Sequence, residues 1–319
     1  MIATVTPNPC IDYNLQVDEL VRNSTARPKG ALFFPGGAGI NAARAITLLG
    51  GVPVKALGLT GGHVGALLKS LLDSEKVAHD FIDTGLETRI NVLLTLTPDR
   101  SMVRVNAAGP ECVEEHGTKL SKQLLSLDPE PKVVILGGSL PGRKIPPGVP
   151  RDYYARVIDE LKTKKPKIRV VLDCAEGVAL GHGVDKGPYV VEVNEAELGR
   201  LAGRKTLETE KDAVVAVEGL LPRGSEYFVV TRGVHGALVI GKTERYRVTH
   251  SDGVGLSRVG AADAFVGALA WSLAKDEPID VAAKWALAVG TATVLSPASA
   301  MFRREEVDAF LAKTHVERM

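Results

Sequence analysis

Short apolar runs alternate with segments of helical periodicity along most of this sequence, and this rhythm restricts the possible folds more than any other feature. Parallel strands that are covered by helices on both faces read as continuous apolar runs. We therefore expect an α/β fold with a doubly wound, mostly parallel sheet and helices on both faces. The expected strands are residues 2–6, 52–59, 133–136, 168–172, 189–193 and 227–230, and the expected helices include 40–49, 64–72 and 153–164.

Two segments interrupt this rhythm. Residues 11–34 and 86–106 are β-like and amphipathic, which is typical of half-buried strands. Within the second segment, residues 88–97 and 102–105 can pair across a turn at 98–100. Because both segments flank the α/β core, we interpret them as a small β lid on a single domain that spans residues 1–319.

The charge balance and the apolar patterning exclude several classes of function. Lys and Arg number 39 and Asp and Glu number 38, so no overall field attracts nucleic acid or an anionic membrane. Residues 1–9 lack a signal-peptide pattern, and no apolar run reaches the roughly 18 residues that a membrane span needs. Cys10, Cys112 and Cys174 form no CxxC pair, which favours a reducing, cytoplasmic location.

Two segments match the sequence patterns of known nucleotide-binding motifs but lack the context that these motifs require. Residues 236–243 fit G-x-x-x-x-G-K-T, but the middle residues are Ala-Leu-Val-Ile and residues 245–249 alternate, so we predict a β-hairpin there. Residues 37–42 fit G-x-G-x-x-A, but the acidic residue that the dinucleotide fingerprint requires about 20 positions later is missing. Neither match predicts a nucleotide site.

Polar and glycine-rich residues gather where expected strands end or helices begin. They are Asp12 and the segments 36–41, 194–197, 231–236 and 259–265. In open parallel sheets, ligands bind at the carboxyl ends of the strands. Helix N-termini add unpaired amides and a positive dipole end, which suit anions. The sequence therefore predicts a site for an anionic ligand at this edge.

Five motifs occur in a family's order along the chain. They are Thr-x-Asn-Pro…Asp at 6–12, Gly-Gly-x-Gly-x-Asn at 36–41, Thr-Arg-x-Asn at 88–91, Gly-Ser-Leu-Pro at 138–141 and Gly-Ala-x-Asp at 260–263. Together they resemble the PfkB/ribokinase family of carbohydrate kinases, hexose-phosphate branch, over about residues 1–315. The resemblance implies a ribokinase-like fold, a lid that closes over the sugar, and a homodimer contact through that lid.

The same resemblance implies an activity. It is the transfer of a phosphoryl group from ATP, with Mg²⁺, to a ketohexose monophosphate, giving a bisphosphate. Fructose 1-phosphate is favoured over fructose 6-phosphate and tagatose 6-phosphate as the acceptor. Two alternatives stay open: a kinase for an unphosphorylated sugar or nucleoside, and a non-catalytic sensor of a sugar phosphate or nucleotide.

Each residue that matches a family motif carries an implied role. Asp263 is implied as the catalytic base, although a helix N-cap is the structural alternative for it. The implied anion hole for the transferred phosphate consists of Gly260, Ala261 and Ala262. The implied substrate-binding residues are Asp12, Gly36, Gly37, Asn41, Arg89, Ser139 and Arg27. The implied ATP-binding residues are Asn194, Thr231, Gly233 and Gly236, and Glu197 is implied to order Mg²⁺ indirectly with the nucleotide phosphates.

Several positions depart from the family pattern. Ala262 stands where glycine is usual, Glu192 where lysine is usual, and Arg258 where a small hydroxyl residue is common. If residue 262 needs a positive φ, its alanine costs about 1–2 kcal/mol, whereas in a helix the methyl group is tolerated. Ala38 favours the minor phosphofructokinase pattern, whereas residues 88–92 favour the 1-phosphofructokinase and tagatose branches. Residues 142–147 resemble a short insertion.

Overall fold

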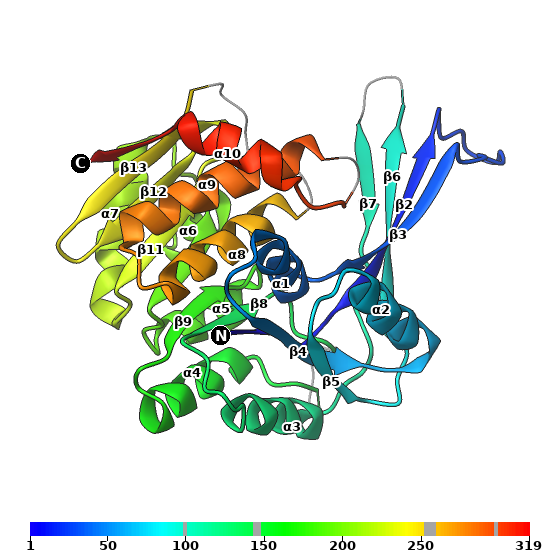
Figure 1. Ribbon diagram of the computed structural model, residues 1–319, viewed down its shortest axis with the longest axis horizontal. Helices are drawn as coiled ribbons and strands as arrows, with labels where there is room; N and C mark the ends of the chain where they lie inside the picture. Colours follow the sequence, from blue (N-terminus) through cyan, green and yellow to red (C-terminus); the bar gives the residue numbers. More distant parts are fainter. Residues whose placement is uncertain (98–100, 143–147, 252–259, 297–298) are drawn as a thin grey trace.

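A ten-stranded sheet forms the centre of the protein (Figure 1). It is described here from a computed structural model that covers residues 1–97, 101–142, 148–251, 260–296 and 299–319. In spatial order its strands are β14 (Thr314–Arg318), β13 (Arg245–His250), β12 (Ala237–Gly241), β11 (Tyr227–Thr231), β10 (Val190–Asn194), β9 (Arg169–Asp173), β8 (Val133–Gly137), β1 (Ile2–Thr6), β4 (Val54–Thr60) and β5 (His79–Asp83).

The sheet is parallel from β5 to β11 and antiparallel from β11 to β14. This arrangement confirms the expected mostly parallel sheet. The hairpin predicted in place of a phosphate-binding loop is also confirmed, because β12 and β13 pair with Ala237 opposite Val248. Sequence analysis did not predict β5 and β14, because polar residues interrupt their apolar positions.

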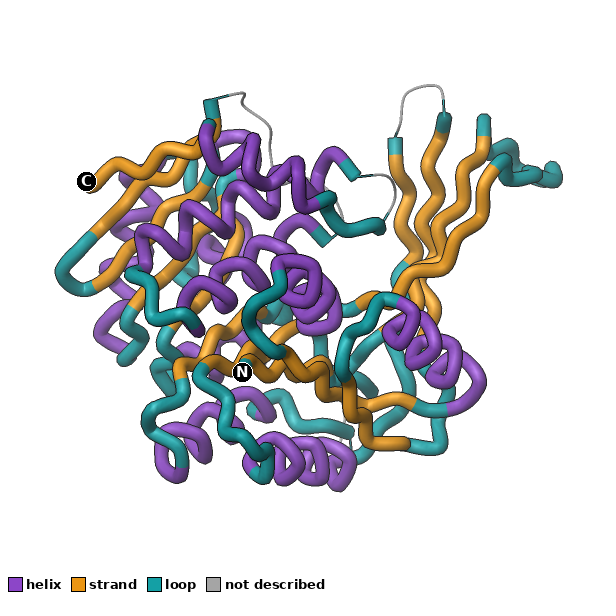
Figure 2. The backbone as a smooth tube through the Cα atoms, viewed as in Figure 1, coloured by secondary structure: helices purple, strands orange, loops and turns teal. Residues whose placement is uncertain are grey.

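Helices cover both faces of this sheet (Figure 2). Alternate residues of one strand serve two separate cores, as Ile2 packs into one and Ala3 into the other. The first core contains residues of α1 (Ala38–Leu49), α2 (Gly62–Ser74), α8 (Ala261–Ala274), α9 (Ile279–Leu295) and α10 (Arg304–Ala312). The second contains residues of α3 (Glu114–Leu125), α4 (Tyr153–Lys164), α5 (Gly177–Val184), α6 (Glu195–Leu201) and α7 (Glu210–Leu220). Burial on both faces explains why the strands are continuous apolar runs.

A second, four-stranded sheet extends away from the α/β body (Figure 1). Its order is β3 (Gly30–Gly36), β2 (Cys10–Val17), β6 (Arg89–Leu96) and β7 (Met102–Val105). These strands come from the two segments that interrupted the α/β rhythm, and the turn expected at 98–100 lies outside the described residues. Within the part of the chain that the structure describes, no helix is both long and apolar enough to cross a bilayer.

Candidate active site

Asp263 lies in the first turn of α8, close to the point where the two sheets meet. Gly260 is the N-cap of this helix, with φ +83°, and no side chain caps it. The interpretation of Asp263 as an N-cap is therefore wrong. Its Oδ2 instead accepts a hydrogen bond of 2.7 Å from Nδ2 of Asn41, which comes from α1.

The surroundings of Asp263 make its carboxylate a stronger base. Burial raises the pKa of Asp263, and the nearby charge of Asp12 raises it further. The hydrogen bond from Asn41 and the cations of Arg104 and Arg44 act in the opposite direction, because they favour the charged form. The net effect is a raised pKa, which improves proton transfer from a hydroxyl group.

Asp263 borders a cavity of about 130 Å³ between the second sheet and the helices α1 and α8. The helices α1 and α8 and the second sheet all contribute to its wall. Five residues expected to act together, Asp12, Gly37, Asn41, Arg89 and Asp263, all reach this cavity. The complete lining is Cys10, Asp12, Gly37, Asn41, Arg89, Asn91, Leu93, Arg104, Asn106 and Asp263.

Asp12 is fixed by its neighbours on both sides of β2. Asn91 lies opposite it in the register with β6, and its Nδ2 donates a 3.0 Å hydrogen bond to Asp12 Oδ1. On the other side, a Cβ at Gly36 would lie only 2.8 Å from Asp12 Oδ2. Gly36 therefore permits the close approach of the carboxylate rather than contacting a ligand through a side chain. Sequence analysis assigned no role to Asn91, although it belongs to the Thr-Arg-x-Asn motif.

Arg89 links this cavity to a larger neighbouring one. The larger cavity measures about 590 Å³ and is also bordered by Ser139, Arg151 and Glu176. Arg89 NH1 and NH2 donate to the carbonyl oxygens of Ala107 and Asn8, both at 2.9 Å. Its Nε is buried and has no partner among the described residues. The guanidinium is thus anchored by two bonds and keeps donors for an anion.

Arg27 does not join these residues. It is exposed in the loop between β2 and β3 and borders a separate small pocket with Asp18 and Thr25. The expectation that Arg27 meets the same ligand as Arg89 is therefore not supported within one chain. The sequence could not reveal this separation, because it depends on the length and direction of the projecting strands.

The residues expected to bind the nucleotide lie at the carboxyl ends of neighbouring strands. Asn194 ends β10, Thr231 ends β11, and the two are paired in the parallel register. Asn194 Oδ1 accepts from the backbone N–H of Glu197 at 2.9 Å, and Glu197 Oε2 accepts from the N–H of Asn194 at 3.0 Å. This reciprocal cap fixes the start of α6. Gly233 and Gly236 lie in the loop after β11.

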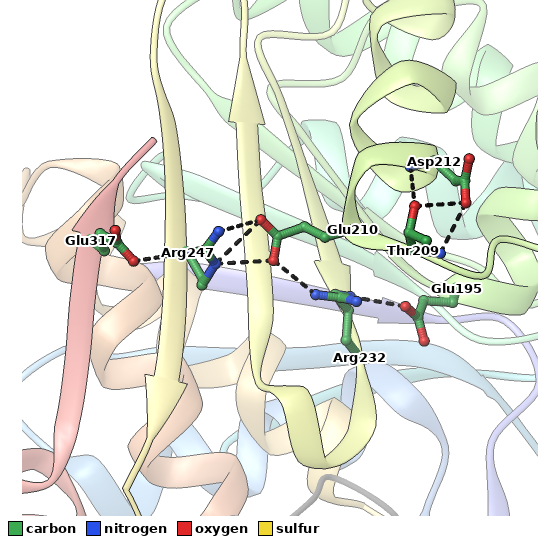
Figure 3. Close-up of polar contacts among 7 residues, drawn as sticks. All are labelled: Glu195, Thr209, Glu210, Asp212, Arg232, Arg247 and Glu317. Carbon is green, nitrogen blue, oxygen red and sulfur yellow. Dashed lines mark hydrogen bonds and ion pairs between the residues drawn. The ribbon is translucent and has the colours of Figure 1, made fainter.

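An ion-pair network joins these two strand ends (Figure 3). Arg232 donates to Glu195 at 2.9 Å and to Glu210 at 3.1 Å. Glu210 also accepts from Arg247 on β13 at 2.6 Å, and Arg247 reaches Glu317 on β14 at 2.6 Å. Arg232 follows Thr231 and Glu195 follows Asn194, so the network holds the two expected nucleotide segments together.

Two carboxylic acids that share a face of the sheet lie beside this edge. Glu192 on β10, which is buried, is the register partner of Asp173 on β9, which is half-buried. Burial raises the pKa of both well above its usual range, and their mutual proximity and Glu197 add to the effect on Glu192. Thr231 Oγ1 donates to Glu192 Oε1 at 3.0 Å. Sequence analysis missed Asp173, although an acid directly after an expected strand is a usable signal.

The residues available for Mg²⁺ at this edge are carboxylates. Glu197 uses Oε2 in the cap of α6, while its Oε1 accepts no hydrogen bond from the described residues. A carboxylate oxygen beside phosphate groups is the kind of ligand that Mg²⁺ takes in kinases, together with water. Among the residues that the structure describes, no group of three or more His, Cys, Asp or Glu side chains is arranged to hold a metal ion.

The structure resolves one of the departures from the family pattern. Ala262 has a helical conformation as the second residue of α8, and Gly260 adopts the positive φ instead. The methyl group of Ala262 is therefore tolerated, and the cost considered for a positive φ does not arise. Arg258 and residues 143–147 of the expected insertion lie outside the described residues.

Comparisons with known proteins agree over nearly the whole chain. The sequence profile described as pfkB family carbohydrate kinase matches residues 6–302. The chain is 31% identical over 296 residues to a 1-phosphofructokinase from Bacillus subtilis, covering 93% of each protein. It is 30% identical over 310 residues to an ATP-dependent 6-phosphofructokinase isozyme 2 from Mycobacterium tuberculosis, covering 97% of this chain and 88% of the relative. Phosphofructokinase-2 from Escherichia coli, solved with substrates and products, is similar in structure with a TM-score of 0.88 at 27% identity, covering 98% of both chains.

Proposed function

The chain belongs to the pfkB family of carbohydrate kinases, and on that premise we propose that it transfers the γ-phosphoryl group of ATP to a hydroxyl group of a ketohexose monophosphate. The preferred acceptor in this proposal is fructose 1-phosphate. One observation carries it: Asp263, Asp12, Asn41 and Arg89 meet at a single cavity. That cavity combines a base, two hydroxyl-binding groups and a cation that suits a phosphate.

In the proposed reaction, Asp263 accepts the proton of the attacking hydroxyl group. The hydroxyl oxygen forms a bond to the γ-phosphorus, the bond from that phosphorus to the β,γ-bridging oxygen breaks, and ADP leaves. The raised pKa of Asp263, caused chiefly by burial, favours this proton transfer. Backbone N–H groups of residues 260–262 at the start of α8 would stabilise the charge on the transferred group.

The acceptor is held by groups of two kinds. The Asp12 carboxylate, fixed by Asn91, is suited to accept hydrogen bonds from sugar hydroxyls. Arg89 would bind the phosphate already on the sugar, because a guanidinium offers paired donors that match phosphate oxygens. Ser139, on the wall of the adjoining cavity, would add a hydroxyl donor to the same phosphate.

The nucleotide would lie along the ends of β10 and β11. We assign Asn194, Thr231, Gly233 and Gly236 to ATP, since the register and the ion pairs of Arg232 bring these segments together. Glu197 would help to hold Mg²⁺ through water and the nucleotide phosphates. Bound Mg²⁺ neutralises charge on the phosphates during transfer.

The four-stranded sheet would act as a lid and as a dimer contact. Asn91, Arg104 and Asn106 bring its polar side chains to the acceptor cavity. Its outer strands expose several large apolar side chains, which in a monomer would face water. Large apolar side chains exposed along the two outer strands favour association with a second copy. The exposed fractions are 57% for Leu32, 43% for Phe33, 43% for Val103 and 57% for Val105.

Fructose 6-phosphate is the second candidate acceptor. The relative named 6-phosphofructokinase isozyme 2 is 30% identical to this chain, and the relative named 1-phosphofructokinase is 31% identical. Both sugars carry a phosphate that Arg89 would bind. The two candidates differ in which hydroxyl faces Asp263.

The experiment is ADP formation by purified protein with MgATP. The acceptor panel contains fructose 1-phosphate, fructose 6-phosphate, tagatose 6-phosphate, ribose, fructose and adenosine. Asp263→Asn is the matched control, because it keeps the shape of the side chain and removes the base. Turnover on fructose 1-phosphate that this variant abolishes supports the proposal. Faster turnover on another phosphosugar reassigns the substrate, and ATP binding without any turnover favours a sensor.

A further inference from the structure

Arg44 is a buried cation that contacts Asn41, the residue that donates to the proposed base. It lies on α1 and is 2% exposed. Its Nε and NH2 donate to the carboxylate of Glu75 at 2.5 and 2.7 Å. Its NH1 donates to Asn41 Oδ1 at 3.1 Å and to the carbonyl oxygens of Pro35 and Ser299, both at 3.2 Å. A buried guanidinium is tolerated when its donors are satisfied in this way.

The contact with Arg44 determines which end of the Asn41 amide faces Asp263. Because Arg44 can only donate, it pairs with the Asn41 oxygen, and the Asn41 nitrogen is left to face the carboxylate. The opposite orientation would place the amide oxygen against Asp263 Oδ2 and the amide nitrogen against the guanidinium. Both contacts would then be repulsive, so Arg44 allows one orientation only.

We propose that Arg44 is a positioning residue for phosphoryl transfer. Arg44 fixes the Asn41 amide, and this amide holds the Asp263 carboxylate ionised and oriented toward the acceptor hydroxyl. The inference rests on the proposed function, since only a kinase reaction needs Asp263 as a base. It extends the role of Asn41 beyond sugar binding. The second N–H of Asn41 remains free to reach an acceptor in the cavity.

The charges around Asp263 fix the direction of the expected pH effect. Asp12 opposes ionisation of Asp263, whereas the Asn41 hydrogen bond, Arg104 and Arg44 favour it. When the amide donor is lost, the pKa of Asp263 rises. The acid limb, the low-pH side of the pH profile of kcat/KM, then moves to higher pH. The other titratable groups whose charge interacts with Asp263 are Cys10 on β2, Asp173 on β9 and Glu192 on β10.

The first variant is Arg44→Lys, which retains the positive charge. An ammonium group has three donors and no planar fork, so it cannot serve Glu75, two carbonyl oxygens and Asn41 together. We expect kcat to fall by about 10-fold or more, the acid limb to move to higher pH, and the KM for ATP to stay within about 2-fold. An unchanged kcat and acid limb in a folded variant would overturn the proposal.

A double-mutant cycle tests whether Arg44 acts through Asn41. In an Asn41→Ala background, Arg44→Lys should change kcat no further, because the amide that it orients is absent. Additive losses in kcat would mean that Arg44 supports the fold only, and would overturn the proposal. Leu48→Ala is the matched control, since this exposed side chain of the same helix takes no part in the hydrogen bonds of Arg44 and Asn41, so kcat should stay within about 2-fold.

A second variant covers the case in which Arg44→Lys does not fold. Asn41→Asp keeps an oxygen toward Arg44 and places a second oxygen, instead of an N–H donor, against Asp263. The acid limb should move to higher pH and kcat should fall, and an unmoved limb would overturn the proposal. Wild-type protein without turnover on any phosphosugar would refute the proposed function and this inference together. Wild-type turnover with unaffected Arg44 and Asn41 variants would refute the inference alone.

Discussion

Replacing Gly260 by alanine should damage both stability and catalysis, because Gly260 supplies the left-handed turn before α8. Its φ is +83°, where a residue with a Cβ costs about 1–2 kcal/mol. Among the described residues, the added Cβ would come no closer than 3.5 Å, to Met301 Cε, and it would lie 3.9 Å from Asn41 Nδ2. The expected cost is backbone strain, and we expect the free energy of unfolding to fall by about 1–2 kcal/mol.

The same backbone strain should also lower kcat. If the chain relieves this strain by rotating the peptide groups of residues 260–262, their N–H groups would turn away from the phosphate that we propose they hold. Loss of one such donor lowers kcat by about 10²–10³-fold. Urea denaturation measures the first effect, and ADP formation at saturating ATP and acceptor measures the second.

Ala262→Gly is the reciprocal control. Residue 262 is already helical, so glycine there should destabilise the protein by at most about 1 kcal/mol and change kcat by less than about 3-fold. A gain of about 10-fold or more in kcat would mean that the reaction requires glycine at 262, and our interpretation of the helix start would be wrong. Gly260→Ala with unchanged unfolding energy and unchanged kcat would refute it as well.

Three further predictions concern the acceptor, the buried acids and the nucleotide. Arg89→Ala should raise the KM for a phosphorylated acceptor by about 10- to 100-fold and leave the KM for ATP unchanged, because a charge-assisted hydrogen bond contributes about 1.5–3 kcal/mol. An unchanged acceptor KM in steady-state assays would contradict this role of Arg89. Burial and the nearby charge of Asp173 raise the pKa of Glu192. Above about pH 4.3 the unfolded chain loses the Glu192 proton while the folded state keeps it. The free energy of unfolding therefore falls by about 1.4 kcal/mol per pH unit until the folded-state pKa is reached. Glu192→Gln should flatten this decline in urea denaturation between about pH 5 and 8, and a slope equal to that of the wild type would be the contrary result. Arg232→Gln should raise the KM for ATP several-fold and leave kcat nearly unchanged, because it releases Glu195 and Glu210 beside the nucleotide segments; an ATP titration with the wild-type KM would rule this out.

Much of the α/β body follows from local patterns in the sequence. The expected helix at 153–164 coincides with α4, and the run at 133–136 lies within β8. Such elements are predictable because burial on both faces demands an apolar run, and a helix with one buried face demands apolar residues at helical spacing. The edge strands β5 and β14 were missed, since an edge is covered less completely and permits polar residues.

The sequence by itself determined the order of the motifs, the fold class and the residues that we propose carry the chemistry, including Asp263 and Arg89. These are properties of residues near one another in the chain, where spacing and residue type are sufficient. Only the tertiary structure decided that Asn41 donates to Asp263 across 222 positions and that Arg27 lies apart from Arg89. The physical reason is that a hydrogen bond requires contact within about 3 Å and a particular orientation. Packing of distant segments creates that geometry, and no local pattern records it.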